Sequence, residues 1–186
     1  MQDNDIYERL KEVKTEREEI YDGVIIHFVK DTVKLPNGAT SKREVAFHNG
    51  AVCIVALTDD NEIIMEKQYR YPFDEVIWEI PAGKLDKNDT DPLNAAMREL
   101  KEETGYTAEN YRFIGEYYGS PAILRERIFM YLATGLKSGE QKLDADEFLD
   151  VVKLPLEEVV KMISENKIPD GKTQAAVLKA KLLLGL

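Results

Sequence analysis

The first part of the chain contains two runs of β-branched and polar residues separated by a turn signal. Residues 24–35 read VIIHFVKDTVKL and residues 41–48 read SKREVAFH. Both compositions favour strands, and Pro-Asn-Gly at 36–38 favours a turn between them. We therefore predict a hairpin and treat residues 1–48 as a β-rich N-terminal element. Because an isolated hairpin buries little surface, it should pack against the main body or against a second subunit.

After a second turn at Asn49-Gly50, the pattern predicts a denser domain over residues 49–186. The run AVCIVAL at 51–57 is a strand, and a hairpin turn follows it at Asp59-Asp60-Asn61. Further strands are expected at 62–69, 75–80, 112–118, 127–134 and 149–153, and helices at 91–104, 155–165 and 172–184. Because short turns join many of the strands, the order indicates an α+β (mixed α/β) fold and not a doubly wound parallel sheet.

The segment 91–104 has a helical period with signals at both ends. Asp91 is a good N-cap residue, Pro92 suits the first helical position, and Gly105 suits the C-terminal stop. Its apolar positions form one stripe that should face the core, and they are Leu93, Ala96, Met97 and Leu100.

Three glutamates lie beside this stripe. At about 100° per residue, Glu99, Glu102 and Glu103 share an arc of roughly 100°. Their mutual repulsion and their place near the C-terminal end of the helix are both unfavourable. A hard divalent cation would stabilise the arrangement, because Mg²⁺ prefers carboxylate oxygens. The helix alone also fits an ordinary solvated surface, since Glu is a good helix former.

Charge and cysteine content argue against several classes of function. There are 35 Asp and Glu against 25 Lys and Arg, so the formal net charge is −10, which argues against nucleic-acid binding. A phosphate compound would need a cation to bind here. Cys53 is the only cysteine, and the polar first residues do not look like a secretory signal. With no apolar run approaching the ~20 residues of a membrane span, we expect a soluble cytoplasmic protein.

Residues 83–106 read GKLDKNDTDPLNAAMRELKEETGY. This segment resembles the Nudix box, G-x5-E-x7-R-E-U-x-E-E-x-G-U, in which U is apolar or aromatic. The matching residues are Gly83, Arg98, Glu99, Leu100, Glu102, Glu103, Gly105 and Tyr106. The first half departs from the pattern, because it is one residue longer and Asp89 or Thr90 replaces the expected Glu.

Flanking segments resemble the ADP-ribose pyrophosphatase branch of the Nudix family. They are KQYRYP at 67–72, WEIPAGKLD at 78–86, Pro121, and IPDGKTQAAVL at 168–178. The resemblance implies a Nudix-like α/β/α sandwich preceded by the N-terminal antiparallel hairpin element. One loop departs from the branch pattern SPGF, because residues 122–125 read AILR before Glu126.

The resemblance also implies ligands for a metal ion. Glu99, Glu102 and Glu103, with the carbonyl group of Ala82, would hold Mg²⁺ or Mn²⁺. Arg98 would orient a box glutamate through a bidentate ion pair.

Two candidates remain for the general base, Glu126 and the acidic loop LDADEF at 143–148. In that loop Glu147 matches the family position better than Asp144 or Asp146, and a solvated turn is the alternative. Glu102 and Arg98 complete the candidate catalytic set.

The resemblance further implies substrate contacts at Arg43, Arg70, Phe28 and Pro121. For the two arginines a structural ion pair is the alternative, and Phe28, like Trp78, also fits a core or interface position.

The resemblance thus implies a Mg²⁺-dependent enzyme that hydrolyses ADP-ribose, a nucleoside diphosphate-linked small molecule, to AMP and ribose 5-phosphate. The resemblance, together with the need of the N-terminal hairpin for a partner surface, also implies a homodimer. One alternative is a pyrophosphatase for another nucleotide sugar such as GDP-mannose. Another is a non-catalytic, nucleotide-sensing Nudix-like module, which the intact box glutamates disfavour.

Overall fold

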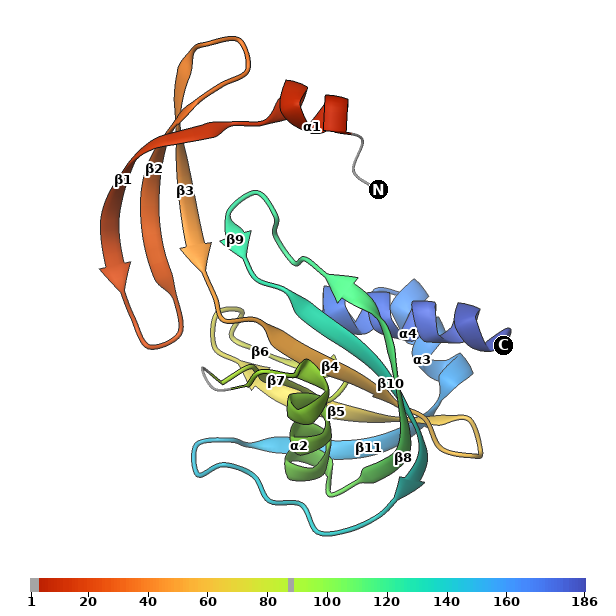
Figure 1. Ribbon diagram of the computed structural model, residues 1–186. Coiled ribbons are helices and arrows are strands. Elements are labelled where there is room, and N and C mark those ends of the chain that lie inside the picture. Colours follow the sequence, from red (N-terminus) through yellow and green to blue (C-terminus); the bar gives the residue numbers. More distant parts are fainter. Residues whose placement is uncertain (1–3, 87–88) are drawn as a thin grey trace. The chain divides into compact units, whose positions relative to one another are not determined.

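The computed structural model of the protein describes residues 4–86 and 89–186 (Figure 1). Contacts within the chain define two units. The first consists of the chain up to Asn49 together with Ser120–Glu126, and the second consists of Gly50–Gly119 and Arg127–Leu186. A role of the N-terminal unit in dimerisation stays a prediction.

The N-terminal unit is built on one sheet. Its elements are α1 (Asn4–Leu10), β1 (Val13–Asp22), β2 (His27–Lys34), β3 (Thr40–Phe47) and β9 (Leu124–Arg125), and the strand order is β1-β2-β3-β9. The predicted hairpin is confirmed, because β2 and β3 pair antiparallel from Lys34 and Thr40 onward. Gly38 takes a left-handed φ of 86° in the turn between them.

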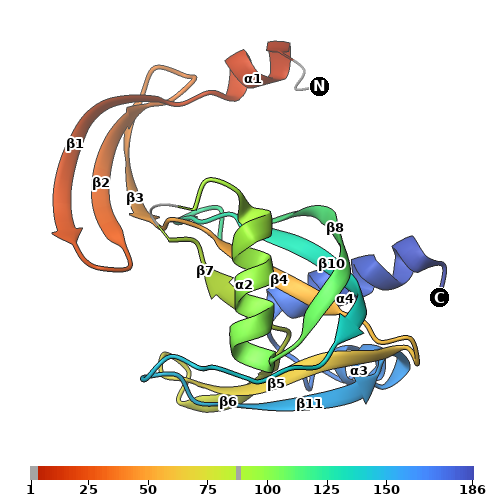
Figure 2. The ribbon, with the colours of Figure 1, turned by 60° about the horizontal axis from the view of Figure 1, so that its bottom comes forward.

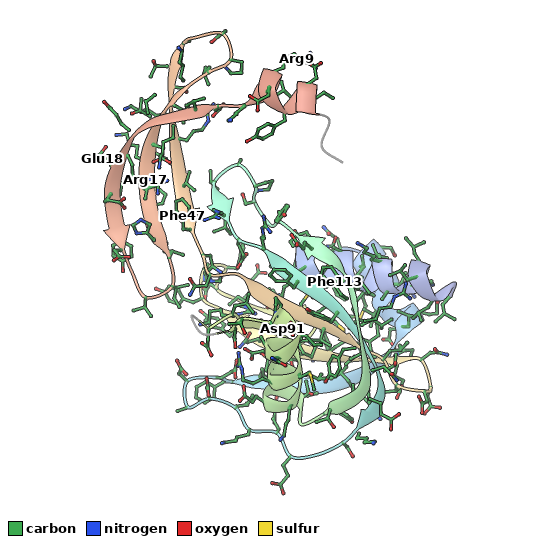
Figure 3. The ribbon with its side chains drawn as sticks, viewed as in Figure 1. Arg9, Arg17, Glu18, Phe47, Asp91 and Phe113 are labelled. Atoms are coloured by element: carbon green, nitrogen blue, oxygen red, sulfur yellow. The ribbon has the colours of Figure 1, made fainter. Side chains whose placement is uncertain are left out.

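Strand β1 is not predicted by the sequence pattern. All ten of its residues are exposed, so its side chains show no alternation between a buried and a solvated face. It is held instead by backbone pairing to β2 and by Arg17, which donates two 2.7 Å hydrogen bonds to Asp31. The Arg17 guanidinium also lies 4.9 Å from the ring centroid of Phe47, and both residues are labelled in Figure 3.

The second unit contains the remaining elements. They are β4 (Ala51–Ala56), β5 (Glu62–Arg70), β6 (Glu75–Glu79), β7 (Ala82–Lys84), α2 (Pro92–Thr104), β8 (Thr107–Tyr117), β10 (Ile128–Lys137), β11 (Leu149–Pro155), α3 (Leu156–Ser164) and α4 (Gly171–Leu184). The strands form two sheets, with orders β7-β4-β10-β8 and β11-β5-β6. Figure 2 shows α2 across one side of these strands, with α3 and α4 on the other. The predicted α+β fold with an α/β/α arrangement is confirmed.

Strand β4 explains why AVCIVAL is apolar without interruption. Val52 and Ile54 pack in the core beneath α2, whereas Cys53 and Val55 pack in the core beneath α3 and α4. A strand that is buried on both faces needs apolar residues at successive positions and not at alternate ones.

Within the described residues, no helix is long and apolar enough to cross a membrane.

Candidate active site

Helix α2 begins and ends where its capping residues predict. The Asp91 side chain, labelled in Figure 3, accepts a hydrogen bond from the Leu93 backbone N–H, and Pro92 occupies the first turn. Gly105 ends the helix with a left-handed φ of 75°.

The buried face of α2 differs from the predicted apolar stripe. Ala95, Ala96 and Leu100 are buried, but Met97 is 44% exposed. Ala95 and Ala96 pack in the same core cluster as Val52 and Ile54 of β4, so the face that meets the strands is rotated toward Glu103. As a result Glu103 lies within the buried face and not at its rim.

The three box glutamates differ strongly in burial. Glu103 is 2% exposed, whereas the side chains of Glu99 and Glu102 are 12% and 42% exposed. The Glu103 Oε2 atom accepts a 2.9 Å hydrogen bond from the backbone N–H of Ala82. This bond joins the end of α2 to the start of β7, where the backbone ligand is expected.

Gly83 leaves room for the Glu99 carboxylate. A Cβ atom on Gly83 would lie 1.9 Å from the Glu99 carboxyl carbon. A side chain at position 83 would therefore displace the carboxylate, which gives a steric reason for glycine at the first position of the box.

Arg98 bridges two glutamates instead of forming the expected bidentate pair with one. Its Nη1 atom donates to Glu99 Oε1 at 2.8 Å and to Glu102 Oε2 at 3.1 Å. Its Nη2 atom is 3.5 Å from Asp89 Oδ2, and the same oxygen accepts a hydrogen bond from the Asp86 N–H. In the altered first half of the box, a carboxylate thus still lies beside Arg98.

Glu66 is a buried carboxylate that the sequence pattern did not single out. It lies in β5, it is 3% exposed, and its Oε1 atom has no hydrogen-bond partner among the described residues. It pairs across the strands with Glu79 of β6, and its charge acts on Glu103. An acidic residue at an otherwise apolar strand position is the signal that could have identified it.

The carboxyl groups of Glu66, Glu99 and Glu103 have raised pKa values. Burial and the charge of Glu66 raise the pKa of Glu103, while burial and the charge of Glu79 raise the pKa of Glu66. Burial raises the pKa of Glu99 to about 7, although the Arg98 charge opposes it. A positive charge placed among them would favour their ionised forms.

A cationic cluster lies beside the carboxylates. Arg70 donates to both oxygens of Glu79, at 2.5 and 2.7 Å, and Lys172 of α4 contacts the same carboxylate. Although burial alone would raise the pKa of Glu79, the Arg70 hydrogen bonds and the Lys172 charge hold it below its usual value. Arg70 is therefore fixed in place, with its side chain 39% exposed.

Glu147 lies close enough to the site for its charge to act on Glu66, Glu99 and Glu103. It is half-buried, and its N–H donates to the Asp144 carbonyl in a turn. Asp144 and Asp146 are exposed. Of the three acidic residues in this loop, Glu147 thus has the clearest link to the box.

The remaining predicted residues belong to the N-terminal unit. The carboxylate of Glu126 is 3.0 Å from His48 Nδ1, and Arg43 forms a two-point ion pair with Glu12. Phe28 is half-buried in β2, and Pro121 is exposed.

The described residues fit a hard divalent cation by their chemistry. Their fit rests on the buried carboxylates, on the unpartnered Glu66 oxygen and on the space that Gly83 leaves for Glu99. In residues 4–86 and 89–186, no three His, Cys, Asp or Glu already form a group that could hold a metal ion. Arg98 donates to oxygens of Glu99 and Glu102, and the Ala82 N–H donates to one oxygen of Glu103.

Comparison with known proteins identifies the family of the chain. Residues 47–177 match the NUDIX domain. An ADP-ribose pyrophosphatase of Bacillus subtilis (strain 168) is 43% identical over 170 residues, covering 90% of this chain and 91% of the relative. A protein named methanol dehydrogenase activator, from Bacillus methanolicus, is 46% identical over 169 residues, covering 90% of each chain.

A solved structure shares the fold. It is titled as the crystal structure of an ADP compounds hydrolase, and it superposes with a TM-score of 0.84 at 21% identity, covering 94% of this chain and 95% of the other. The chain therefore belongs to the NUDIX family, and the resemblance seen in its sequence is confirmed. Hydrolases of this family generally use divalent metal ions.

Proposed function

We propose that this protein is a diphosphatase that hydrolyses ADP-ribose to AMP and ribose 5-phosphate. The observation that carries the proposal is the buried carboxylate site on α2, in which Glu103 is bonded to the Ala82 N–H and Glu99 fills the space beside Gly83. The similarity to an ADP-ribose pyrophosphatase over nine-tenths of both chains supports the choice of substrate.

Glu99, Glu102, Glu103 and the Ala82 carbonyl are the groups that would hold Mg²⁺, with Mn²⁺ as a substitute. When bound, a divalent ion polarises a phosphoryl oxygen and makes a bound water more acidic. The net reaction adds one water across the diphosphate, so that one phosphorus–oxygen bond breaks and each product keeps one phosphate.

The chain's own residues would orient the reactants. Arg98 fixes Glu99 and Glu102 in relation to each other, and Glu79 fixes Arg70 so that its guanidinium can bind the diphosphate. Glu147, whose charge already acts on the box glutamates, is our first candidate to take the proton of the attacking water. Glu126, which is paired with His48, is the second.

The experiment is a phosphate-release assay coupled to alkaline phosphatase, with ADP-ribose, GDP-mannose, ADP-glucose, NADH and nucleoside triphosphates, each with and without Mg²⁺. Metal-dependent cleavage led by ADP-ribose is the expected result. No cleavage of any compound would contradict the proposal and favour a nucleotide-sensing module.

GDP-mannose is the alternative substrate that a specific feature favours. Residues 122–125 read AILR where the branch usually carries a glycine, and more distant relatives are named GDP-mannose pyrophosphatases. If GDP-mannose leads the panel, the diphosphatase mechanism stands and this loop becomes the first region to mutate.

The relative named methanol dehydrogenase activator favours a second candidate function, activation of a dehydrogenase. Adding the purified protein and Mg²⁺ to a methanol dehydrogenase assay tests it. Stimulation by the wild type but not by Glu103→Gln would connect the activation to the diphosphatase site.

We further propose that the protein acts in the cytoplasm as a homodimer. The free and buried thiol of Cys53 suits a reducing compartment. Strand β1 is an edge strand, and exposed apolar residues lie at and beside it, including Ile20, Tyr21 and Val24. Edge strands and apolar patches of this kind are usually covered. Sedimentation of a monomer at micromolar concentration would contradict the dimer.

A further inference from the structure

The first turn of α4 is bonded to the segment that leads into β7. Thr173, which is fully buried, accepts a 3.0 Å hydrogen bond at Oγ1 from the backbone N–H of Ile80. The same hydroxyl donates a 2.6 Å hydrogen bond to Asp170 Oδ2. One hydroxyl group thus joins two parts of the chain that are 93 residues apart.

Asp170 holds this hydroxyl in place. Its Oδ2 atom also accepts hydrogen bonds from the Thr173 backbone N–H and from Lys172 Nζ, both at 3.0 Å. Lys172 in turn contacts Glu79, the residue before Ile80, and its side chain is 12% exposed. Because the cluster is largely buried, the Thr173 hydroxyl group has few alternative hydrogen-bond partners.

The segment 80–82 carries two groups of the candidate metal site. Ile80 lies between the end of β6 and the start of β7, so its N–H is outside the strand pairing and depends on Thr173. Two residues further along, Ala82 donates its N–H to Glu103 and is the residue whose carbonyl group is expected to bind the metal. Strand β4 also holds this segment, because the Ile54 N–H donates to the Pro81 carbonyl and Ala82 pairs with Cys53. The Thr173 bond anchors the Ile80 end, and its loss would loosen that end and disturb the Ala82 carbonyl and the Glu103 carboxylate.

We propose that Thr173, oriented by Asp170, is a positioning residue for the divalent-cation site. It anchors the Ile80 end of residues 80–82 and thereby contributes to the placement of the Ala82 carbonyl and Glu103. This inference rests on the proposed function, because it assigns the cation to that site. Partners of this kind commonly matter to a metal site nearly as much as its ligands do.

Helix capping by itself does not require the Thr173 hydroxyl. The cap is the hydrogen bond from the Thr173 backbone N–H to Asp170, and any residue except proline at position 173 can donate it. Replacing the hydroxyl therefore separates a positioning role from a capping role.

The test compares Thr173→Val with Thr173→Ser. Valine keeps the shape and the capping N–H but leaves the Ile80 N–H without an acceptor, whereas serine keeps the hydroxyl. Val177→Ala is the matched structural control, because Val177 is fully buried in the same helix and belongs to the same core cluster as Ile80, but its side chain forms no hydrogen bond.

Mn²⁺ affinity is measured without substrate by electron paramagnetic resonance, together with thermal unfolding and the separate kcat and KM for ADP-ribose. Thr173→Val should bind Mn²⁺ roughly tenfold more weakly, and its kcat should fall at subsaturating metal. Thr173→Ser should restore the wild-type affinity. Val177→Ala should lower the unfolding temperature but leave Mn²⁺ affinity unchanged.

Two results would overturn the inference. One is wild-type Mn²⁺ affinity in Thr173→Val with only a lower unfolding temperature, as in the control. The other is equal weakening in the valine and serine variants, which would exclude the hydroxyl. If Thr173→Val does not fold, Thr173→Ala removes the hydroxyl without placing a methyl group against Asp170, and the same criteria apply. A wild-type protein that neither binds Mn²⁺ nor cleaves ADP-ribose would instead contradict the proposed function.

Discussion

The backbone of Gly83 faces the carboxylate of Glu99 so closely that a Cβ atom on Gly83 would lie 1.9 Å from the Glu99 carboxyl carbon. The group in the way is the end of a flexible side chain and not backbone. The chain can therefore accommodate alanine at this position by moving Glu99, with little cost to the fold.

The Gly83→Ala variant should fold normally but lose the placement of Glu99. We expect Mn²⁺ affinity and turnover to fall by roughly tenfold or more, while the unfolding temperature changes little. Gly119→Ala is the control, because a Cβ there meets only Tyr117 at an ordinary 3.7 Å. Equal activity in both variants would show that Glu99 does not need its present position.

Glu103→Gln should make the metal-free protein more stable and nearly inactive. Glu103 is buried and its pKa is raised, so folding at neutral pH must take up a proton at this carboxyl group. A neutral side chain removes that cost, and the amide oxygen can still accept the Ala82 N–H. Each kcal/mol gained would raise the unfolding temperature by about 2–4 °C. Turnover should fall by more than the roughly 10–100-fold that loss of an outer-shell partner causes.

Glu102→Gln is the matched comparison, since the Glu102 side chain is 42% exposed. Its effect on metal-free stability should be small. Thermal unfolding in EDTA and the ADP-ribose assay check both variants. A destabilised or fully active Glu103→Gln protein would show that the metal site has been misplaced.

The metal-free protein should lose stability as the pH rises. The pKa of Glu99 is raised from 4.5 to about 7, and those of Glu66 and Glu103 are raised as well. A carboxyl group with a raised pKa binds protons on folding, so its stabilisation is complete below the unfolded pKa and is lost as the pH rises through the folded pKa. The free energy of unfolding should therefore fall between pH 4.5 and pH 7.

Denaturant unfolding in EDTA at a series of pH values measures this slope. Adding Mg²⁺ should reduce the dependence of the free energy of unfolding on pH, because the cation neutralises the carboxylates in place of bound protons. Glu66→Gln should also reduce it, because one group with a raised pKa is removed. Glu79 acts in the opposite sense, since its pKa is lowered from 4.5, and its stabilisation is lost only as the pH falls below that value. A metal-free protein whose stability rises from pH 4.5 to pH 7 would refute the predicted charge state of the site.

Cys53 should not react with thiol reagents in the folded protein. It is completely buried in β4, and burial raises the pKa of its thiol to about 12, so the reactive thiolate is scarce at neutral pH. Colour release from a disulfide reagent should be negligible in buffer and complete in denaturant. Rapid reaction of the native protein would mean that the core around β4 opens readily.

Local signals in the sequence determined much of this protein. Asp91 and Gly105 fix the ends of α2 through hydrogen bonds between near neighbours, and the helical period gathers Glu99, Glu102 and Glu103 on one arc. The run AVCIVAL likewise predicts a strand. These features depend on residues only a few positions apart, so they can be predicted without knowledge of the rest of the chain.

Only the tertiary structure determines which polar and charged groups lie next to each other and which are buried. The pairing of β5 with β6 places Glu66 opposite Glu79, and the docking of α4 brings Thr173 to Ile80. The packing of α2 on β4 buries Glu103 while Met97 stays exposed. Strand register and helix rotation result from packing over the whole core, and no short stretch of sequence carries that information.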